Sequence, residues 1–349
     1  MPIHGILKNT NVLVTNPNDI GRLYQRSCFG VMNSSSQLKL DLLEALFLLG
    51  EKKIQIYQQN QAVSFDELIS YAFRFIPDIE TQYLIFKDLR SRGLMIRPDP
   101  THQYHLLYQS TQNKKHIKAY ISVFSERDSF QIATTQRQCT EAEKKHSELW
   151  YGIVDEEGDI TYYTISKINP TGEITEQHYK KTQGILLTNR VLLFDQKAAR
   201  DLHHQEFYGK PFESGLQLSL IEAIYLHHRG ILDIQTEQQK KISSKRLMKQ
   251  FTMLQPDLHL RLPVFIDLKQ RGLIVKTGFK FGTHFRAYTK RPDATHAEYL
   301  ILVVQNQFES NLSDISRAVR LAHSVHKEIL FAVVQQDTIE YIRFGRLRP

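Results

Sequence analysis

Two similar stretches, LKLDLLEALFL at residues 38–48 and LQLSLIEAIYL at residues 216–226, decide how this chain is organised. Three more pairs repeat in the same order. GILKNTNVLV, from residue 5, recurs as GILLTNRVLL from residue 184. FKDLRSRGLMI, from residue 86, recurs as FIDLKQRGLIV from residue 265, and HIKAYISVF, from residue 116, recurs as HAEYLILVV from residue 296. All four pairs are 178 to 180 residues apart, a regularity that chance similarity of amphipathic segments does not explain. The sequence therefore predicts two tandem repeats, at residues 1–168 and 180–349. The polar segment INPTGEITEQ, with its proline and glycine, is a plausible connector.

Both repeats carry the same succession of element signals. In the second repeat, LQLSLIEAIYL has helical periodicity, and LPVFIDLKQRG predicts a second helix that Gly272 would terminate. Strand-like runs follow (LIVKTGFKFGTHFRAY and EYLILVV), then a helix with Ser313 or Asp314 as its N-cap, then the strands ILFAVV and TIEYIRF. The pattern predicts a fold of the broad α/β class, with helices and mixed sheets combined in the α+β manner. Each repeat should hold an N-terminal α+β subdomain followed by a mixed-sheet subdomain, which in the second repeat spans about residues 276–349.

Composition restricts the class of protein more than the function. Lys and Arg number 45 against 37 Asp and Glu, so the net charge is +8, which is compatible with a polyanionic partner. Cys28 and Cys139 show no metal-ligand spacing, and the histidine pairs at 203–204 and 227–228 point in different directions on a helix; we expect no metal or other cofactor. There is no membrane-length apolar run and no signal-peptide core at the amino end, which predicts a cytoplasmic protein.

Three polar residues stand at the ends of predicted elements in the second repeat. Tyr288 follows a strand, His296 precedes the next strand, and Lys327 ends the helix that contains RLAHSVHKEIL. A phenol, an imidazole and an ammonium group can cleave RNA without a metal: one removes the 2′-hydroxyl proton, one protonates the leaving 5′-oxygen, and one stabilises the charged phosphorane. Each residue also has an ordinary structural role, such as a helix-terminal cation for Lys327, so their types alone do not decide between catalysis and structure.

The runs YGKPFESGLQLSLIEAIYL, FIDLKQRGLIVKTGFKFGTHFRAY, HAEYLILVV and RAVRLAHSVHKEILFAVV closely resemble the archaeal-type tRNA-splicing endonucleases. The resemblance covers nearly all of the second repeat and, less strictly, the first, and it implies that the mixed-sheet subdomain of each repeat is nuclease-like. It implies that Tyr288 is the general base, His296 the general acid and Lys327 the electrostatic stabiliser in cleavage of precursor tRNA at both ends of an intron. It also implies a bulge-helix-bulge substrate and products with 2′,3′-cyclic phosphate and 5′-hydroxyl ends, without a metal.

The resemblance further implies two arginines that clamp a flipped base, a geometry that suits planar guanidinium groups. Arg320 matches the first position. Arg343 in the last strand is the choice for the second, with Arg346 as the alternative because the preceding loop shifts the register.

The first repeat lacks part of this set. Tyr108 and His116 match Tyr288 and His296, but Ser147 replaces the lysine and Thr140 the arginine of the helix. Without either cation we expect a structural copy, as in the two-unit homodimeric class of the resembling family, although Tyr108 and His116 leave residual activity open.

An acidic turn, made of Asp155, Glu156, Glu157 and Asp159, separates the last two strands of the first repeat. It can be an ordinary solvated hairpin. In the resembling family an acidic loop at this place inserts into a partner unit, which implies a homodimer with two active sites.

Two other functions predict different residues. A non-catalytic RNA-binding or scaffolding subunit would not need the intact set Tyr288, His296 and Lys327. A metal-dependent nuclease on a similar sheet predicts clustered acidic ligands, which the catalytic helix and strands do not show.

Overall fold

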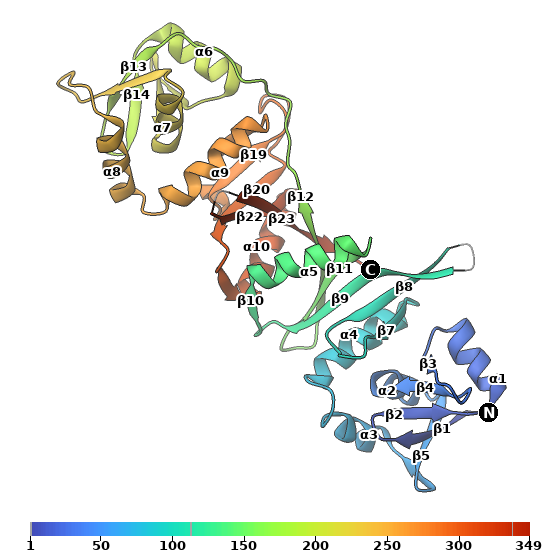
Figure 1. Ribbon diagram of the computed structural model, residues 1–349. Coiled ribbons are helices and arrows are strands. Elements are labelled where there is room, and N and C mark those ends of the chain that lie inside the picture. Colours follow the sequence, from blue (N-terminus) through green and yellow to red (C-terminus); the bar gives the residue numbers. More distant parts are fainter. Residues whose placement is uncertain (1, 112–113, 337) are drawn as a thin grey trace. The chain divides into compact units, whose positions relative to one another are not determined.

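A computed structural model describes residues 2–111, 114–336 and 338–349 (Figure 1). The chain divides into two compact units. The first contains residues 1–166, 309–319 and 344–349, and the second contains residues 167–308 and 320–343. The units therefore differ from the sequence halves, because short segments of the second repeat belong to the first unit. None of the helices in the described ranges combines the length and apolar character needed to cross a membrane.

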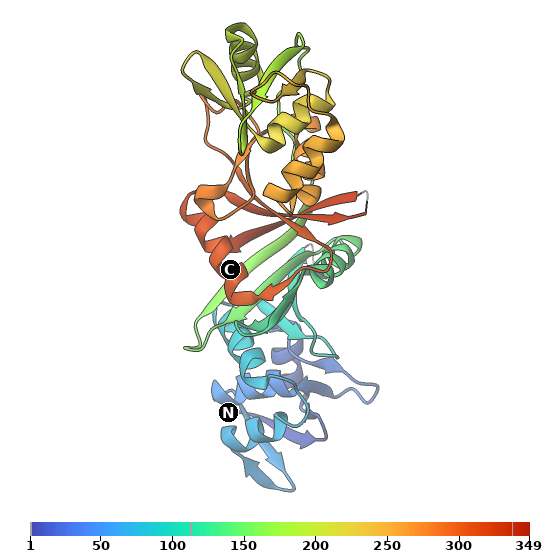
Figure 2. The ribbon, with the colours of Figure 1, turned by 90° about the vertical axis from the view of Figure 1, so that its left-hand side faces the viewer.

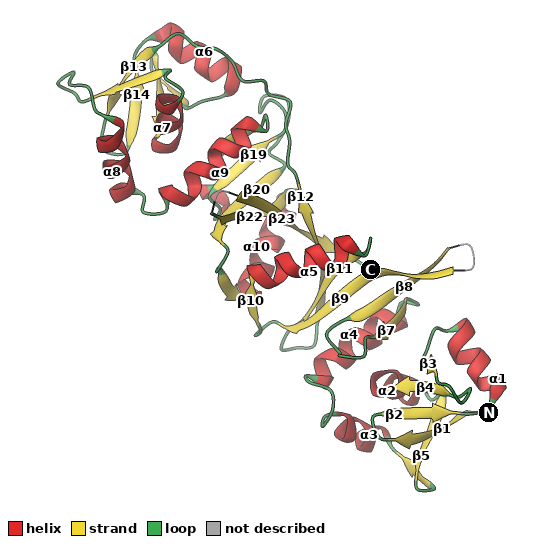
Figure 3. Cartoon of the chain, in the orientation of Figure 1, coloured by secondary structure: helices red, strands yellow, loops and turns green. Residues whose placement is uncertain are grey.

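Each repeat begins with a small sheet and its helices (Figure 3). In the first repeat the strand order is β3-β4-β2-β1-β5-β6, and in the second it is β15-β16-β14-β13-β17. The first set consists of β1 (Ile3–Lys8), β2 (Asn11–Val14), α1 (Pro17–Ile20), η1 (Gly21–Arg26), β3 (Val31–Met32), β4 (Leu38–Asp41), α2 (Leu42–Gly50), β5 (Ile54–Gln58), β6 (Gln61–Val63) and α3 (Phe65–Ala72). The second set consists of β13 (Thr182–Leu186), β14 (Arg190–Leu193), α6 (Gln196–Glu206), β15 (Lys210–Phe212), β16 (Gly215–Ser219), α7 (Leu220–His228), β17 (Leu232–Gln235) and α8 (Ser244–Leu254).

A larger mixed sheet follows in each repeat. In the first unit, strands β7-β8-β9-β11-β12 are neighbours, and in the second unit β18-β19-β20-β22-β23 are neighbours in the same arrangement. The elements of the first repeat are α4 (Ile79–Ser91), β7 (Met95–Pro98), β8 (His105–Thr111), β9 (Lys114–Ser125), β10 (Ser129–Gln131), α5 (Ile132–Lys144), β11 (Glu148–Val154) and β12 (Ile160–Ile168). Those of the second are α9 (Leu258–Gln270), β18 (Ile274–Thr277), η2 (Phe279–Phe281), β19 (Phe285–Tyr288), β20 (Tyr299–Gln305), β21 (Glu309–Asn311), α10 (Leu312–Ser324), β22 (Glu328–Gln335) and β23 (Thr338–Leu347).

This mixed α+β architecture confirms the predicted fold class. The parallel pairs β9–β11 and β20–β22 are joined by crossovers that contain α5 and α10, whereas the other pairs described in these sheets are antiparallel. Gly272, with φ +77°, directly follows the C-cap of α9, as predicted for a residue that ends a helix.

Two predicted helix starts were wrong. The first four residues of LQLSLIEAIYL form the end of β16, and α7 begins only at Leu220. Ser219 caps that helix, and its hydroxyl accepts a hydrogen bond from the backbone of Glu222. Alternating leucines at positions 216, 218 and 220 fit a strand and a helix equally well, so the capping serine decides the boundary. Similarly, α10 begins at Leu312, before both Ser313 and Asp314.

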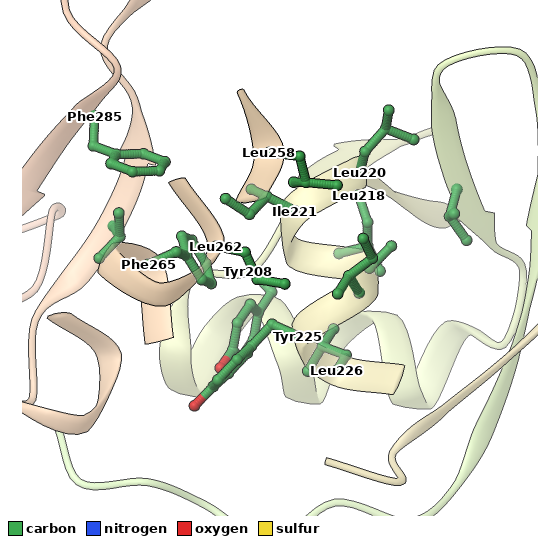
Figure 4. Packing of buried hydrophobic residues seen from close by; sticks show 14 of the residues in the cluster. Tyr208, Leu218, Leu220, Ile221, Tyr225, Leu226, Leu258, Leu262, Phe265 and Phe285 are labelled. Carbon is green, nitrogen blue, oxygen red and sulfur yellow. The ribbon is translucent and has the colours of Figure 1, made fainter. Parts of the chain in front are cut away.

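The core of the second unit lies between α7, α9 and one face of the larger sheet. Figure 4 shows Leu258, Leu262 and Phe265 of α9 facing Ile221 and Tyr225 of α7. Phe285, Ala287, Ile301, Leu330 and Ala332 complete this core from the sheet. In the view of Figure 2 the yellow-to-orange helices α8 and α9 lie together. This face of the sheet is closed by apolar packing, so the ends of its strands remain for chemistry.

Candidate active site

Three neighbouring strands bring Tyr288, His296 and Lys327 to one edge of the sheet in the second unit. Ala287 of β19 pairs with Tyr299 of β20, and Tyr299 pairs with Glu328 of β22. Tyr288 directly follows this row, Lys327 directly precedes it, and His296 lies in the loop three residues before it. Strand register therefore gathers residues that are up to 39 positions apart in the sequence.

Backbone hydrogen bonds fix the loop that carries His296. The amide of Glu298 donates to the carbonyl of Ala287 at 3.1 Å, and the amide of Glu328 donates to the carbonyl of Glu298 at 2.8 Å. The amide of Thr289 donates to the Glu298 carboxylate at 2.8 Å, which ties the start of the loop to its end. His296 itself is exposed, so its imidazole is open to a bound substrate.

The Tyr288 ring is held on the face opposite α9. Its neighbours Phe285 and Ala287 point into the core under α9, whereas Tyr288 packs in a separate small cluster with Ile274 and Ala297. Only 8% of Tyr288 is exposed, and Ala297 directly follows His296. This packing restricts the phenol and keeps it near the histidine loop.

A left-handed turn places Lys327. After α10 ends at Ser324, His326 adopts φ +54° and the Lys327 amide donates to the Ala322 carbonyl at 2.9 Å. The Lys327 ammonium donates to the Val325 carbonyl at 3.2 Å and lies 5.8 Å from the centre of the Phe281 ring. The ammonium has no carboxylate partner among the described residues, so its charge is available to an anion.

The two arginine positions differ in their surroundings. Arg320 is exposed on α10. Arg343 Nη1 lies 3.3 Å from the Glu328 carboxylate. Arg343 is two residues after the core residue Tyr341 in β23, so the two side chains lie on the same face of the strand. Arg343 thus lies on the α9 face of its strand, opposite to the face of Tyr288. The alternative, Arg346, is exposed in the first unit.

Comparison with known proteins places the chain in a family. The tRNA intron endonuclease N-terminal domain matches twice, at residues 3–69 and 182–248, and the tRNA intron endonuclease catalytic C-terminal domain matches twice, at residues 79–162 and 258–341. This chain belongs to the tRNA intron endonuclease family. It is 35% identical over 335 residues to a tRNA-splicing endonuclease of Methanococcoides burtonii, with 94% of this chain and 95% of that protein covered. Identity is 34% to the enzyme named so from Methanosarcina barkeri and 29% to that from Halobacterium salinarum, with the same coverage.

The family match confirms the resemblance found in the sequence and makes the chain an endoribonuclease of tRNA introns. The catalytic-domain model matches both repeats, but the two copies differ where the chemistry would occur. In the first tRNA intron endonuclease repeat, the Ser147 hydroxyl donates to the Ile117 carbonyl at 2.9 Å, and the Thr140 hydroxyl donates to the Gln136 carbonyl at 2.8 Å. Both side chains are thus engaged with backbone, and neither supplies a positive charge.

The tyrosine and histidine of the first repeat also stand in a different local structure. Tyr108 and His116 belong to a long hairpin in which β8 runs to Thr111 and β9 starts at Lys114. His116 pairs with Gln109 there, whereas the equivalent His296 lies in a loop. Burial raises the pKa of Tyr108 above its usual range. Sequence spacing aligned Tyr108 and His116 with the tyrosine and histidine of the second repeat. It could not reveal that Tyr108 and His116 both lie within a sheet.

The acidic turn connects β11 and β12 of the first tRNA intron endonuclease repeat. Asp155 Oδ1 accepts hydrogen bonds from the amides of Glu157 at 3.0 Å and Asp159 at 2.9 Å, and Gly158 adopts φ +84°. Glu156 pairs with Arg127. Asp155 therefore shapes the turn, while Glu156, Glu157 and Asp159 are exposed at its tip.

Two residues beside Tyr288 and Lys327 were missed in the sequence. Arg286 places its guanidinium 5.8 Å from the centre of the Tyr288 ring, and Phe281 lies under the Lys327 ammonium. Both belong to the run KTGFKFGTHFRAY, whose alternation after the turn could have placed Arg286 on the same face as Tyr288.

Proposed function

We propose that this protein cuts precursor tRNA at both ends of an intron, within a bulge-helix-bulge, by a metal-independent transesterification. The observation that carries the proposal is the convergence of Tyr288, His296 and Lys327 at one sheet edge in the second repeat. The first repeat lacks the cation at the equivalent place. The repeats, at residues 1–168 and 180–349, would thus be a structural copy and a catalytic copy, working in the cytoplasm.

Each of the three residues has one task in the proposed reaction. Tyr288 takes the proton from the 2′-hydroxyl, and the freed oxygen attacks the adjacent phosphorus. The bond from phosphorus to the 5′-oxygen breaks, and His296 gives that oxygen a proton. Lys327 stabilises the negative charge that accumulates on the phosphoryl oxygens. The products are a 2′,3′-cyclic phosphate and a 5′-hydroxyl, so the atoms balance without water or a cofactor.

Recognition of RNA shape agrees with the exposed cations near this edge. The major groove of an A-form helix is too narrow for side chains to read, so the substrate would be selected by its bulges and backbone. Arg320 and Arg343 are proposed to hold the flipped base. Because Arg343 is paired with Glu328, it would have to exchange that partner when RNA binds.

The assembly is proposed to be a homodimer in which the acidic turn at residues 155–159 binds a partner subunit. An intron has two ends, and a two-fold dimer supplies two catalytic copies. The exposed carboxylates at the tip of the turn support this role.

The deciding experiment is cleavage of a labelled bulge-helix-bulge RNA in excess EDTA, with chemical identification of the product ends. We expect cyclic phosphate and 5′-hydroxyl ends. Cleavage that appears only after magnesium is added would show a metal-dependent nuclease, and tight binding without cleavage would show a scaffolding subunit.

Matched substitutions in the two repeats test the assignment of residues. His296→Ala and Lys327→Ala should each lower the single-turnover cleavage rate by about 10²- to 10⁴-fold, because each removes a group that acts in the transition state. RNA affinity should change little. His116→Ala and Ser147→Ala, at the equivalent places of the first repeat, should leave the rate unchanged. Equal losses in both repeats would contradict a single catalytic copy.

A further inference from the structure

A cavity of about 550 Å³ lies within the second unit, between its small sheet and the strands β18 and β19. Among the described residues, its lining carries five cationic side chains (Arg190, Lys210, Arg261, Lys276 and Arg286) but only one carboxylate, Glu222. We call it the basic cleft. One of its residues, Arg286, also approaches the Tyr288 ring, so the cleft begins beside the candidate active site.

Two of these five cations form ion pairs within the fold. Lys276 Nζ lies 3.1 Å from the buried Glu222, whose Oε1 also accepts a hydrogen bond from the Gly209 amide at 3.0 Å. Arg261 is paired with Asp257. These contacts explain two of the five cations as part of the fold.

The other three cations have no ion pair with a described carboxylate. Arg190 donates only to the amide side chains of Asn189, at 2.9 Å, and Gln217, at 3.1 Å. Lys210 is exposed. The Nε atom of Arg286 is buried without a hydrogen-bond partner in the described part of the chain. Three uncompensated positive charges around one cavity repel one another, and a bound anion would relieve that repulsion.

The first repeat has a corresponding cavity of about 420 Å³, which serves as an internal comparison. The contacts of the buried glutamate are the same in this cavity: the Glu44 carboxylate accepts a hydrogen bond from the Gly30 amide at 2.9 Å and lies 3.6 Å from Arg97. Its lining contains Lys39 and Arg97 against the carboxylates of Asp41, Glu44 and Asp99. The same fold therefore forms without a positive excess in the cavity.

Strand register identifies three cations of the second cavity that replace neutral residues of the first. Arg190 pairs with Ser219, as Asn11 pairs with Asp41. Arg286 pairs with Lys276, as Leu106 pairs with Arg97. Lys210 follows Gly209, as Val31 follows Gly30. The repeat that carries the candidate catalytic residues thus has cations where the other repeat has neutral side chains.

We propose that the basic cleft binds the sugar-phosphate backbone of the RNA strand that leads away from the cleaved bond. Arg286 contacts the phosphate nearest the active site, and Arg190 and Lys210 of the N-terminal subdomain contact phosphates further along. This proposal rests on the proposed function, because it takes precursor tRNA as the ligand. It gives the small sheet of the second repeat a role in substrate binding.

Lys210→Gln and Arg190→Gln test the proposal, since neither residue holds the fold together. In a His296→Ala background that blocks cleavage, each should weaken binding of an intron-containing precursor tRNA by about three- to tenfold. Each should also lower the slope of log Kd against log salt by about one, because one phosphate contact is lost. With His296 intact, each should also slow cleavage at subsaturating enzyme by a similar factor, because less substrate is bound. Lys39→Gln in the first cavity is the matched control and should alter neither quantity.

The outcomes separate the two proposals. Wild-type affinity and salt slope in Lys210→Gln and Arg190→Gln, together with normal cleavage, would overturn the basic cleft and leave the proposed function standing. The same loss in Lys39→Gln would show that overall charge, and not the cleft, sets the affinity. Failure of the unsubstituted protein to bind or cut the precursor would overturn the proposed function, and the cleft with it.

Discussion

His105 and Phe285 occupy the same place in the two repeats, as the pairing of Pro98 with His105 and of Thr277 with Phe285 shows. The Phe285 ring lies 5.9 Å from that of Phe265, and the His105 ring lies 5.7 Å from that of Phe86. His105 is fully buried, and neither ring nitrogen has a hydrogen-bond partner in the described residues. Burial, and to a lesser degree the charge of His102, lowers the pKa of His105 to about 4. At this position the core of the first repeat thus holds a titratable side chain where the second repeat has a phenylalanine.

His105→Phe should make the first unit more stable and less sensitive to acid. Because the pKa of His105 is lower in the folded than in the unfolded protein, its contribution is fully present above about pH 6.5 and is lost as the pH falls towards 4. The loss amounts to roughly 3 kcal/mol. His102, whose pKa is raised by Asp41 against the effect of burial, contributes in the opposite direction but is present in both proteins. Urea unfolding from pH 7 to 4 should give a flatter profile for the variant, and identical profiles would contradict the assignment.

The connector between the repeats is hydrogen-bonded to the backbone at the end of α9. The Gly172 amide donates to the Arg271 carbonyl at 2.9 Å, and the Ile174 amide donates to the Gly272 carbonyl at 3.0 Å. The side chain of Ile174 packs against the cluster that contains Tyr288. A Cβ atom on Gly272 would lie 2.7 Å from the Gly172 carbonyl oxygen, so glycine is required there for close approach as well as for its positive φ. A connector read from the sequence as a simple linker therefore supports the candidate active site.

Gly272→Ala should cost more stability than the matched Gly93→Ala. Both glycines follow the C-cap of equivalent helices, α9 and α4, with φ of +77° and +83°, but a Cβ atom at Gly93 would meet nothing within 4 Å. Gly93→Ala should cost about 1–2 kcal/mol from backbone conformation alone. Gly272→Ala adds about 1–3 kcal/mol for the clash with the connector. Chemical unfolding of the two variants measures the difference, and equal costs would show that the connector yields freely.

The molecule as a whole consists of two copies of one fold with different distributions of charge. The first copy carries the exposed acidic turn, and the second carries the basic cleft and the candidate catalytic residues. Such a division suits an assembly in which one repeat binds a partner subunit and the other binds RNA. Neither role needs a change of fold.

Reversing two charges at the acidic turn should weaken the proposed homodimer. Glu156→Lys with Glu157→Lys leaves Asp155, which shapes the turn, in place, but converts attraction to a basic partner surface into repulsion. Sedimentation at several concentrations should show more monomer, and cleavage activity should fall in parallel. Glu213→Lys with Glu237→Lys changes the net charge equally at exposed sites elsewhere and should leave the assembly intact. A dimer of unchanged stability would contradict the role of the turn.

The sequence by itself determined the duplication, the mixed α+β class, most strands and helices, and a family resemblance specific enough to predict Tyr288, His296 and Lys327. These features are encoded locally, in periodicity, in ordered repeats and in short motifs. Only the tertiary structure decided where α10 begins, that Arg343 pairs with Glu328, and that β21 of the second repeat pairs with β10 of the first. It also brought together Arg190, Lys210 and Arg286 around one cavity. Such contacts depend on strand register and subdomain packing between distant residues, whereas a local pattern constrains only the residues within it.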